Sequence, residues 1–271
     1  MAATEEKDFI VFNGIKYEWL GQSTVRMTTD DGFVIYTDPI LLDENPPKAD
    51  LILISHHHVD HCLPEFVALI RDDNTKLAAF HDSYLKYCVQ DIKGVRTVKI
   101  GQTIELAGVK ITGTEAYTPR GFHIKGEGCG FLIEIKGQPL TSLSLAEAKG
   151  LPLASHSLVK GQRIYFAGDT TNIKEMEELK DIDCAILPIC DNAYAIYTED
   201  IIKAVKIIKP KLFIPVHFTP IDEPDPVVKE GMFATKDPRF FTRKEDPESL
   251  LPLFEGTGIQ VAILKKLVRL S

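Results

Sequence analysis

The stretch Ser55-His56-His57-His58-Val59-Asp60-His61 decides the fold of this chain. It begins at the end of Leu51–Ser55, a continuous apolar run typical of a buried strand. It is followed by Pro64–Arg71, which has the pattern of a short helix with proline in its first turn. We therefore expect a strand, a polar loop rich in histidine and a helix in direct succession.

The same stretch predicts a metal centre. His56 and His58 are two residues apart on an extended segment and point to the same side. Asp60 and His61 follow where the chain turns toward the helix. Neutral imidazole and carboxylate are the groups that hold divalent first-row metals. Because burying so many imidazoles without a metal would leave polar atoms unpaired, four such groups at one strand end favour a metal site.

Short β-rich runs separated by turn residues precede the histidine stretch and predict an antiparallel meander. The Asn-Gly and Asp-Gly pairs between them tolerate the positive φ of tight hairpin turns. The expected strands of this first part are Phe9–Phe12, Ile15–Trp19, Val25–Thr28 and Phe33–Tyr36.

Strand and helix patterns alternate along the rest of the chain. Further strands are expected at Lys76–Phe80, Val95–Ile100, Thr103–Leu106, Val109–Thr114, Gly130–Ile135, Arg163–Ala167, Cys184–Ile189, Leu212–Val216 and Ile259–Leu264. Further helices are expected at Ser83–Asp91, Ile173–Leu179, Glu199–Ile208 and Pro247–Phe254. Two meander-rich halves, each followed by strand-helix units, predict an α/β (α+β) fold with two packed sheets and helices outside, a four-layer αββα sandwich.

No linker separates the two halves, so we expect residues 1–271 to form a single domain. Gly137–Gly161 interrupts an expected hairpin with prolines and a Ser/Leu/Ala-rich middle, and it is expected to be an inserted surface excursion. Pro220–Asp246 is rich in proline and lacks periodicity, which is typical of a long loop.

Composition limits the partners and the compartment. With 44% hydrophobic and 26% charged residues the chain is ordinary for a globular protein, and its formal net charge of −8 repels nucleic-acid phosphates and anionic membranes. Five cysteines without closely paired spacing favour a reducing compartment. The N-terminus lacks the basic start of a signal peptide, and no apolar stretch is long enough for a bilayer. We expect a cytoplasmic protein with a small-molecule substrate and neither membrane nor nucleic-acid partner; the sequence leaves a homo-oligomer open.

Four further motifs accompany the histidine stretch: Trp19-Leu20-Gly21-Gln22-Ser23, Tyr36-Thr37-Asp38-Pro39, Phe166-Ala167-Gly168-Asp169-Thr170 and Ile214-Pro215-Val216-His217-Phe218. In this order, and with His-x-His-x-Asp-His at positions 56–61, they resemble the metallo-β-lactamase superfamily. The resemblance is to the branch that contains ascorbate-6-phosphate lactonase and other metal-dependent hydrolases. It runs from about Tyr17 to His217, most of the chain. It implies a metal-dependent hydrolase.

The resemblance also implies a ligand set for two divalent ions. Zinc is the first choice for both ions, and manganese is the second choice. The set for one ion is His56, His58 and a later histidine, and the set for the other is Asp60, His61 and His217. Asp169 would bridge both ions, and Gly168 before it lets the backbone bend and approach closely.

Three histidines compete for the place of the later ligand. His123 precedes Gly130–Ile135, where the family has its third histidine, so we assign it. His81 ends an expected strand and fits a capping or solvent-facing role better, while His156 lies in the expected excursion. His57 points away from its neighbours and is expected to pack or to support a ligand.

The metal pair suggests the mechanism. Two cations lower the pKa of a bridging water, generate hydroxide near neutral pH and polarise the bond under attack, so no nucleophilic serine is needed. Asp60 is the expected catalytic residue, because a carboxylate at such a centre can orient the water and accept its proton.

The substrate is defined only as a class: an ester, a lactone or a phosphodiester. The branch commonly has a glycine-rich stretch where this chain has Cys190-Asp191-Asn192-Ala193-Tyr194, which argues against direct transfer of the lactonase substrate. Candidate substrate contacts are Tyr117, Arg120, Asn192 and Tyr194. Two alternatives are a mononuclear iron oxygenase, similar to persulfide dioxygenases of the same superfamily, and a binding module without catalysis. Elemental analysis separates one iron from two zinc or manganese ions.

Overall fold

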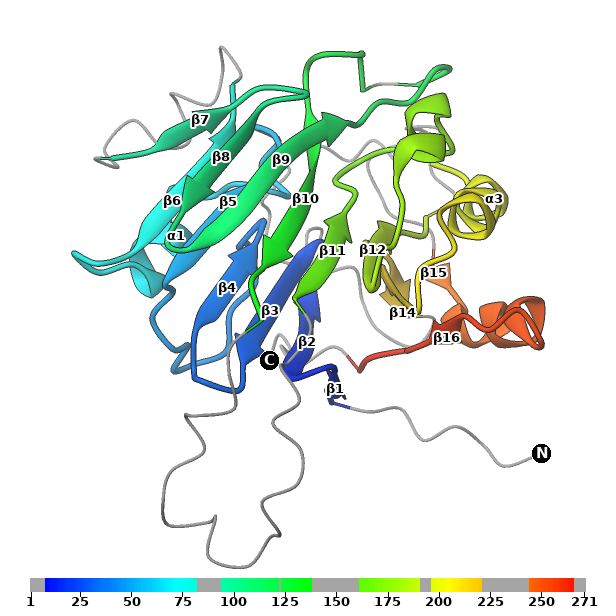
Figure 1. Ribbon diagram of the computed structural model, residues 1–271, viewed down its shortest axis with the longest axis horizontal. Helices are drawn as coiled ribbons and strands as arrows, with labels where there is room; N and C mark the ends of the chain where they lie inside the picture. Colours follow the sequence, from blue (N-terminus) through cyan, green and yellow to red (C-terminus); the bar gives the residue numbers. More distant parts are fainter. Residues whose placement is uncertain are drawn as a thin grey trace, which may run out of the picture.

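The computed structural model describes residues 8–81, 94–121, 123–137, 161–190, 196–220 and 244–265, in which two seven-stranded sheets account for most of the strands (Figure 1). The first sheet takes its strands in chain order: β1 (Ile10–Phe12), β2 (Ile15–Gly21), β3 (Thr24–Thr29), β4 (Val34–Thr37), β5 (Leu51–Ile54), β6 (Lys76–Phe80) and β7 (Arg96–Val98). The order in the second sheet is β16 (Gln260–Val261), β13 (Leu212–Val216), β12 (Cys184–Pro188), β11 (Gln162–Phe166), β10 (Cys129–Ile135), β9 (Val109–Glu115) and β8 (Thr103–Leu106). A two-stranded sheet joins β14 (Thr219–Pro220) to β15 (Lys244–Glu245).

The two large sheets share one plan. In the first, β1 to β4 pair antiparallel and β4 to β7 pair parallel. In the second, β8 to β11 pair antiparallel, and parallel pairing then continues from β11 through β12 and β13 to β16. This confirms the prediction of two meanders that each continue into strand-helix units. Because parallel strands end at the same edge of a sheet, the loops that follow them are brought together.

Strand β5 shows why two layers of core form. Leu51 and Leu53 belong to the apolar core between the sheets, whereas Ile52 and Ile54 belong to a second core on the outer face. That second core also contains Val67 of α1 (Pro64–Ile70). The side chains of a strand alternate between its two faces, so a wholly apolar strand must be covered on both sides.

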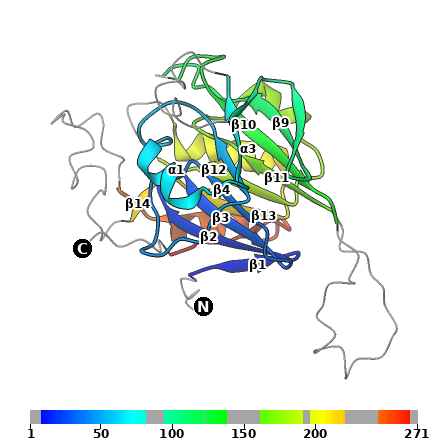
Figure 2. The same cartoon turned by 90° about the vertical axis from the view of Figure 1, so that its left-hand side faces the viewer.

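Helices complete the outer layers (Figures 1 and 2). Helix α1 covers the first sheet, and α3 (Thr198–Ile208) buries Ile201 and Val205 against the core of the second. Helix α3 ends at Lys209, whose φ of 51° is left-handed and stops the helical hydrogen-bond pattern. The predicted αββα sandwich is confirmed.

Three elements differ from their predictions. Lys174–Glu178 and Pro247–Phe254 are 3₁₀ helices, not α-helices. The first is only five residues long, and Pro252 inside the second lacks the backbone N–H that an α-helix needs. The last predicted strand, Ile259–Leu264, pairs with its neighbour only over Gln260–Val261.

Some predictions fall outside the described residues. The helix expected at Ser83–Asp91 lies there entirely, and so does most of the excursion expected at Gly137–Gly161. The strands that flank the excursion pair directly, with Ile135 opposite Gln162. Within the part of the chain that the structure describes, no helix has both the length and the apolar character needed to cross a membrane.

Candidate metal centre

The histidine loop connects β5 to α1 and is folded by its own backbone. The carbonyl of His58 accepts hydrogen bonds from the N–H groups of His61 and Cys62, both at 2.9 Å. The resulting turn brings Asp60 and His61 back toward His56. The carbonyl of Ser55 accepts a hydrogen bond from the N–H of Cys129 at 3.1 Å, which ties the start of the loop to the second sheet.

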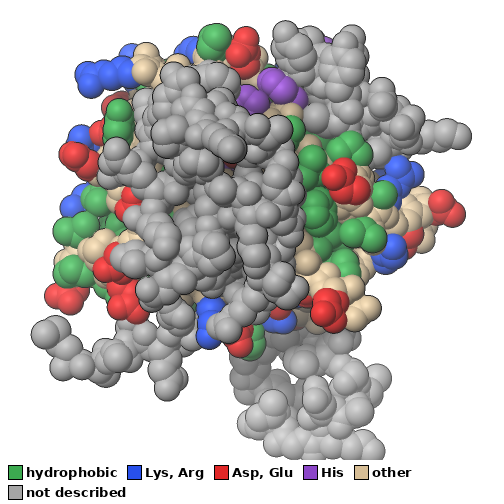
Figure 3. Space-filling model, turned by 180° about the vertical axis from the view of Figure 1, so that it is seen from behind, with side chains coloured by type: hydrophobic (Ala, Val, Ile, Leu, Met, Phe, Trp, Pro, Cys, Tyr) green, Lys and Arg blue, Asp and Glu red, His purple; other side chains and the backbone are tan. Residues whose placement is uncertain are grey.

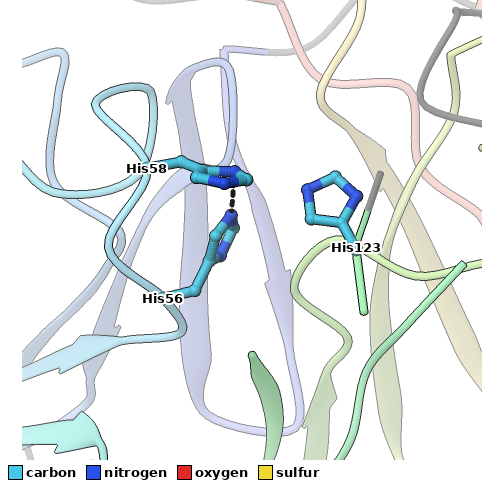
Figure 4. A group of neighbouring side chains, drawn as sticks. All are labelled: His56, His58 and His123. Carbon is cyan, nitrogen blue, oxygen red and sulfur yellow. Dashed lines mark hydrogen bonds between the residues drawn. The ribbon is translucent and has the colours of Figure 1, made fainter. Parts of the chain in front are cut away.

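The first group of candidate ligands is His56, His58 and His123, whose nearest ligand atoms lie within 4.8 Å of one another (Figure 4). His56 Nε2 and His58 Nδ1 are 3.0 Å apart. His123 comes from the loop between β9 and β10 and faces the other two rings across the sandwich. Two reciprocal bonds with Thr118 hold it: the N–H of Thr118 donates to the carbonyl of His123 at 2.9 Å, and the N–H of His123 donates to Thr118 Oγ1 at 3.1 Å.

The second group is Asp60, His61 and His217, again with ligand atoms within 4.8 Å of one another. His217 follows β13 with a φ of 61°, a strained value for a non-glycine residue that is typical of functional sites. Its N–H donates to the carbonyl of Gln22 at 2.8 Å, and the indole of Trp19 donates to the same oxygen at 2.7 Å. Trp19 also stacks on Phe218, with ring centroids 4.4 Å apart. The Trp19–Ser23 motif therefore fixes the backbone of His217.

Asp169 lies between the two groups. Its Oδ2 is 3.2 Å from His123 Nε2, and its Oδ1 is 3.2 Å from His61 Nε2 and 3.5 Å from His217 Nε2. Gly168 precedes it with a φ of 62°, and a Cβ at that position would lie 2.7 Å from the carbonyl oxygen of Cys129. Only glycine allows this approach. The two carboxylate oxygens of Asp169 thus face different histidine groups.

Several ligand atoms are buried without a hydrogen bond. Among the described residues none makes one with Asp169 Oδ1, His61 Nε2 or His217 Nε2. Buried polar atoms are nearly always hydrogen-bonded, and exceptions call for an explanation such as an ion. All three atoms point at one another, and imidazole nitrogen with carboxylate oxygen is a donor set suited to zinc. The residues therefore fit a metal.

The electrostatics of the two groups differ. Burial alone would lower the pKa of His61, but the carboxylates of Asp169 and Asp60 raise it to about 10. The pKa of His217 is also raised well above its ordinary value, chiefly by Asp169 against the effect of burial. In the first group, burial lowers the pKa of His58 to about 4 and that of His56 well below its ordinary value. The first group thus offers neutral imidazoles, while the second holds positive charge against its carboxylates.

Asp38 orients ligands of both groups, and we did not predict this role from the sequence. Its side chain is wholly buried at the end of β4 and accepts from the N–H of Ser55 at 2.7 Å and from Ser55 Oγ at 2.6 Å. Asp38 Oδ2 also lies 2.7 Å from His61 Nδ1, and Ser55 Oγ lies 2.9 Å from His56 Nδ1. Because a carboxylate only accepts, His61 Nδ1 must be the donor, which leaves Nε2 as the ligand atom.

Ser55 fixes the tautomer of His56 in the same way. Its hydroxyl donates to Asp38, so the remaining contact to His56 has the ring N–H as donor. A second supporting residue that the sequence did not reveal is Cys190, whose Sγ is 3.6 Å from His217 Nδ1. The only sequence signal for Asp38 was its motif, in which an aspartate directly follows a buried strand.

The remaining predicted site residues are placed as follows. Tyr117 donates its hydroxyl to Glu175 Oε2 at 3.0 Å, and its backbone is bound to Thr170. Arg120 is exposed, whereas Asn192 and Tyr194 lie outside the described residues.

The other histidines are separate from the two groups. His81 is exposed at the end of β6 and belongs to neither of them within the described part of the chain. The ring of His57 is 4.9 Å from that of His58. His156 lies outside the described residues.

The centre reaches the surface on one side. Its members His58 and His123 are only partly buried, and histidine side chains are visible at the surface when the molecule is seen from behind (Figure 3). The side chain of Asp60 is 21% exposed, against 5% for Asp169. Asp60 is therefore the carboxylate that a substrate or a water molecule can approach.

Comparison with known proteins identifies the family of this chain. The model of the beta-lactamase superfamily domain matches residues 16–143 and 155–217. A UPF0173 metal-dependent hydrolase of Pelotomaculum thermopropionicum is 33% identical over 192 residues, covering 66% of this chain and 72% of that protein. One of Thermococcus onnurineus is 30% identical over 220 residues, covering 75% and 84%.

A solved structure shares the fold over nearly the whole length. It is a metallo hydrolase from Ignicoccus hospitalis, 20% identical with a TM-score of 0.62, and the match covers 93% of this chain and 95% of that one. The family predicted from the motifs is thus confirmed. The chain belongs to the metallo-β-lactamase superfamily and is one of its metal-dependent hydrolases.

Proposed function

We propose that this hydrolase holds two divalent metal ions and cleaves an ester, lactone or phosphodiester bond of a small molecule. The observation that carries the proposal is the position of Asp169, whose oxygens lie 3.2 Å from His123 on one side and 3.2 Å from His61 on the other. A carboxylate between two groups of imidazoles is suited to bridging a metal pair.

The ligand sets follow from the two groups of atoms. One ion would be held by His56, His58 and His123, and the other by Asp60, His61 and His217. Asp169 would contact both. Zinc suits these nitrogen and oxygen ligands best, and manganese is the second choice.

Bound ions would supply a Lewis acid that polarises the scissile bond and lowers the pKa of the attacking water. The chain contributes Asp60, whose pKa lies well below its ordinary value because His61 and His217 outweigh the effect of burial. Asp60 is therefore anionic, and its side chain, 21% exposed, can accept a hydrogen bond from a water molecule and orient it. Asp169 is too buried for this role, and its part is to connect the two ligand groups.

Substrate contacts are proposed on the loops around the opening. Arg120 is exposed in the turn between Thr118 and His123, so its guanidinium can meet an anionic group of the substrate. Tyr117, Asn192 and Tyr194 are the other candidates. A lactone is one substrate of this class, in line with the branch that the motifs resemble.

Metal analysis coupled to a substrate panel tests the proposal. The protein is loaded with zinc or manganese, freed of excess metal, assayed for metal per chain and offered lactones, phosphodiesters and thioesters. We expect two ions per chain and turnover with one of these bond types. One iron per chain with consumption of oxygen would support the oxygenase instead, and a protein that takes up no transition metal would end the proposal.

A further inference from the structure

The two histidines of the second ligand group differ in what holds the ring nitrogen that faces away from the cluster. For His61 this nitrogen is Nδ1, and its partner is the carboxylate of Asp38 at 2.7 Å. For His217 it is again Nδ1, but its partner is the thiol of Cys190 at 3.6 Å. The other nitrogen of His217, Nε2, lies 3.5 Å from Asp169 and 3.6 Å from Asp60.

The topology of the second sheet places Cys190 beside His217. Strands β12 and β13 pair parallel with Pro188 opposite Val216, and the N–H of Ile189 donates to the carbonyl of Val216 at 2.8 Å. Cys190, two residues after the end of β12, and His217, directly after the end of β13, therefore lie at the same edge of the sheet. Cys190 is wholly buried and His217 is 2% exposed, so bulk water does not compete for the ring nitrogen.

We propose that Cys190 is the positioning residue of His217. Sγ accepts the N–H of Nδ1, which fixes the tautomer that leaves Nε2 as the ligand atom. The inference rests on the proposed two-ion centre. Because sulfur is a much weaker acceptor than a carboxylate, the ring of His217 is held more weakly than that of His61. Removal of the thiol should therefore weaken binding of the ion held by Asp60, His61 and His217 and leave the other ion unaffected.

Zinc binding to matched variants tests this inference. Parent, Cys190→Ala, Cys190→Ser, His217→Ala and Cys184→Ala are titrated with zinc against a chelator of known affinity, and bound ions per chain are counted. Cys184 is an equally buried thiol outside the ligand groups, so its variant reports the general effect of losing a buried thiol. Melting curves of the metal-free proteins check that each variant folds.

The expected pattern is specific to one ion. His217→Ala loses one of the two ions. Cys190→Ala binds the same ion about tenfold more weakly and the other with parental affinity, since removal of a residue that supports a ligand costs about 10–100-fold and a thiol is a weak support. Cys190→Ser recovers most of the loss, because its hydroxyl can accept the same N–H. Cys184→Ala binds like the parent.

Other patterns would contradict the positioning role of Cys190, or both that role and the ligand set of the second ion. If His217→Ala loses an ion while Cys190→Ala binds both with parental affinity, the positioning role is wrong and the two-ion centre stands. Equal weakening in Cys190→Ala and Cys184→Ala would likewise remove the positioning role. If His217→Ala still binds two ions with parental affinity, His217 is no ligand, so the positioning role of Cys190 and the proposed ligand set of the second ion both fail.

Discussion

The two sheets reach the metal centre in different ways. Each changes from antiparallel to parallel pairing at one strand, β4 or β11, and an aspartate follows that strand: Asp38 in the first sheet and Asp169 in the second. Asp38 is surrounded by donors, since the backbone and hydroxyl of Ser55 and the ring of His61 all bind it. Asp169 instead has an oxygen without a hydrogen bond among the described residues.

The comparison teaches that topology fixes where a carboxylate lies, while its neighbours decide what it does. A carboxylate whose oxygens are occupied by donors can only orient the groups around it. A carboxylate whose two oxygens face the imidazole nitrogens of two ligand groups, as in Asp169, is available to bind a cation. The first sheet thus supports ligands and also supplies four of them in one loop, whereas the second supplies His123, Asp169 and His217 singly, each from a loop after its own strand.

The largest effect is expected from Asp169→Asn. This variant keeps the size of the side chain but removes the charge that both groups face, so it should lose at least one ion. Turnover should fall about 1,000-fold or more, because metal polarisation contributes several kcal/mol to the transition state. Metal content and initial rates check this, and a variant with two ions and parental turnover would remove Asp169 from the centre.

Asp38→Asn tests the other side of the comparison. The amide can donate toward His61 Nδ1 and so disfavours the tautomer that binds metal, and we expect zinc affinity to fall by about 10–100-fold. The control is Asp183→Asn, since Asp183 is also buried but accepts from the N–H of Arg163 at 2.9 Å and from Lys211 at 2.5 Å, away from the centre. Equal losses in the two variants would mean that Asp38 acts only through the fold.

Gly168→Ala tests the close approach of the backbone before Asp169 to strand β10. The new Cβ would be 2.7 Å from the carbonyl oxygen of Cys129 at a φ of 62°, so the free energy of unfolding should fall by about 1–3 kcal/mol. Gly256→Ala is the control, because its φ of 72° is similar but nothing lies within 4 Å. Denaturant unfolding measures both, and an equal loss would show that the close contact has no cost.

The last prediction concerns the pH dependence of zinc binding. Burial lowers the pKa values of His61 and His217, but the neighbouring carboxylates outweigh it. They hold the pKa of His61 at about 10 and that of His217 above its ordinary value, so the metal-free centre binds protons at neutral pH. Zinc must displace them, and its apparent affinity should therefore rise with pH, by up to about tenfold per unit for each proton released. Titrations between about pH 6 and 8 measure this. Affinity that does not change with pH would contradict the charged second group.

The sequence predicted the parts of the fold and the centre that depend on local pattern. The meander, the strand that ends in the histidine loop and the motif around Asp169 are all visible as short runs of residue types. The prediction of an α-helix at Pro247–Phe254 was wrong because Pro252 lies inside the helix and cannot donate a backbone hydrogen bond. The last strand is short because its pairing with β13 covers only two residues. The resemblance pointed to His123, but the turn with Thr118 that holds it is a tertiary feature.

There is a physical reason why the sequence did not predict the contacts of Asp38 and Cys190 with the ligands. Asp38 and Cys190 contact rings that come from loops after other strands, at 2.7 Å and 3.6 Å, and no spacing along the chain encodes those contacts. The same holds for the carbonyl of Gln22, which fixes the backbone of His217 from a distant turn.

The most direct test of the account is a crystal structure of the zinc-loaded protein with anomalous data collected at the zinc edge. We expect two peaks, one among His56, His58 and His123 and the other among Asp60, His61 and His217, with an oxygen of Asp169 beside each. A single peak that Asp169 does not touch, or no peak within these residues, would contradict the bridged two-ion centre.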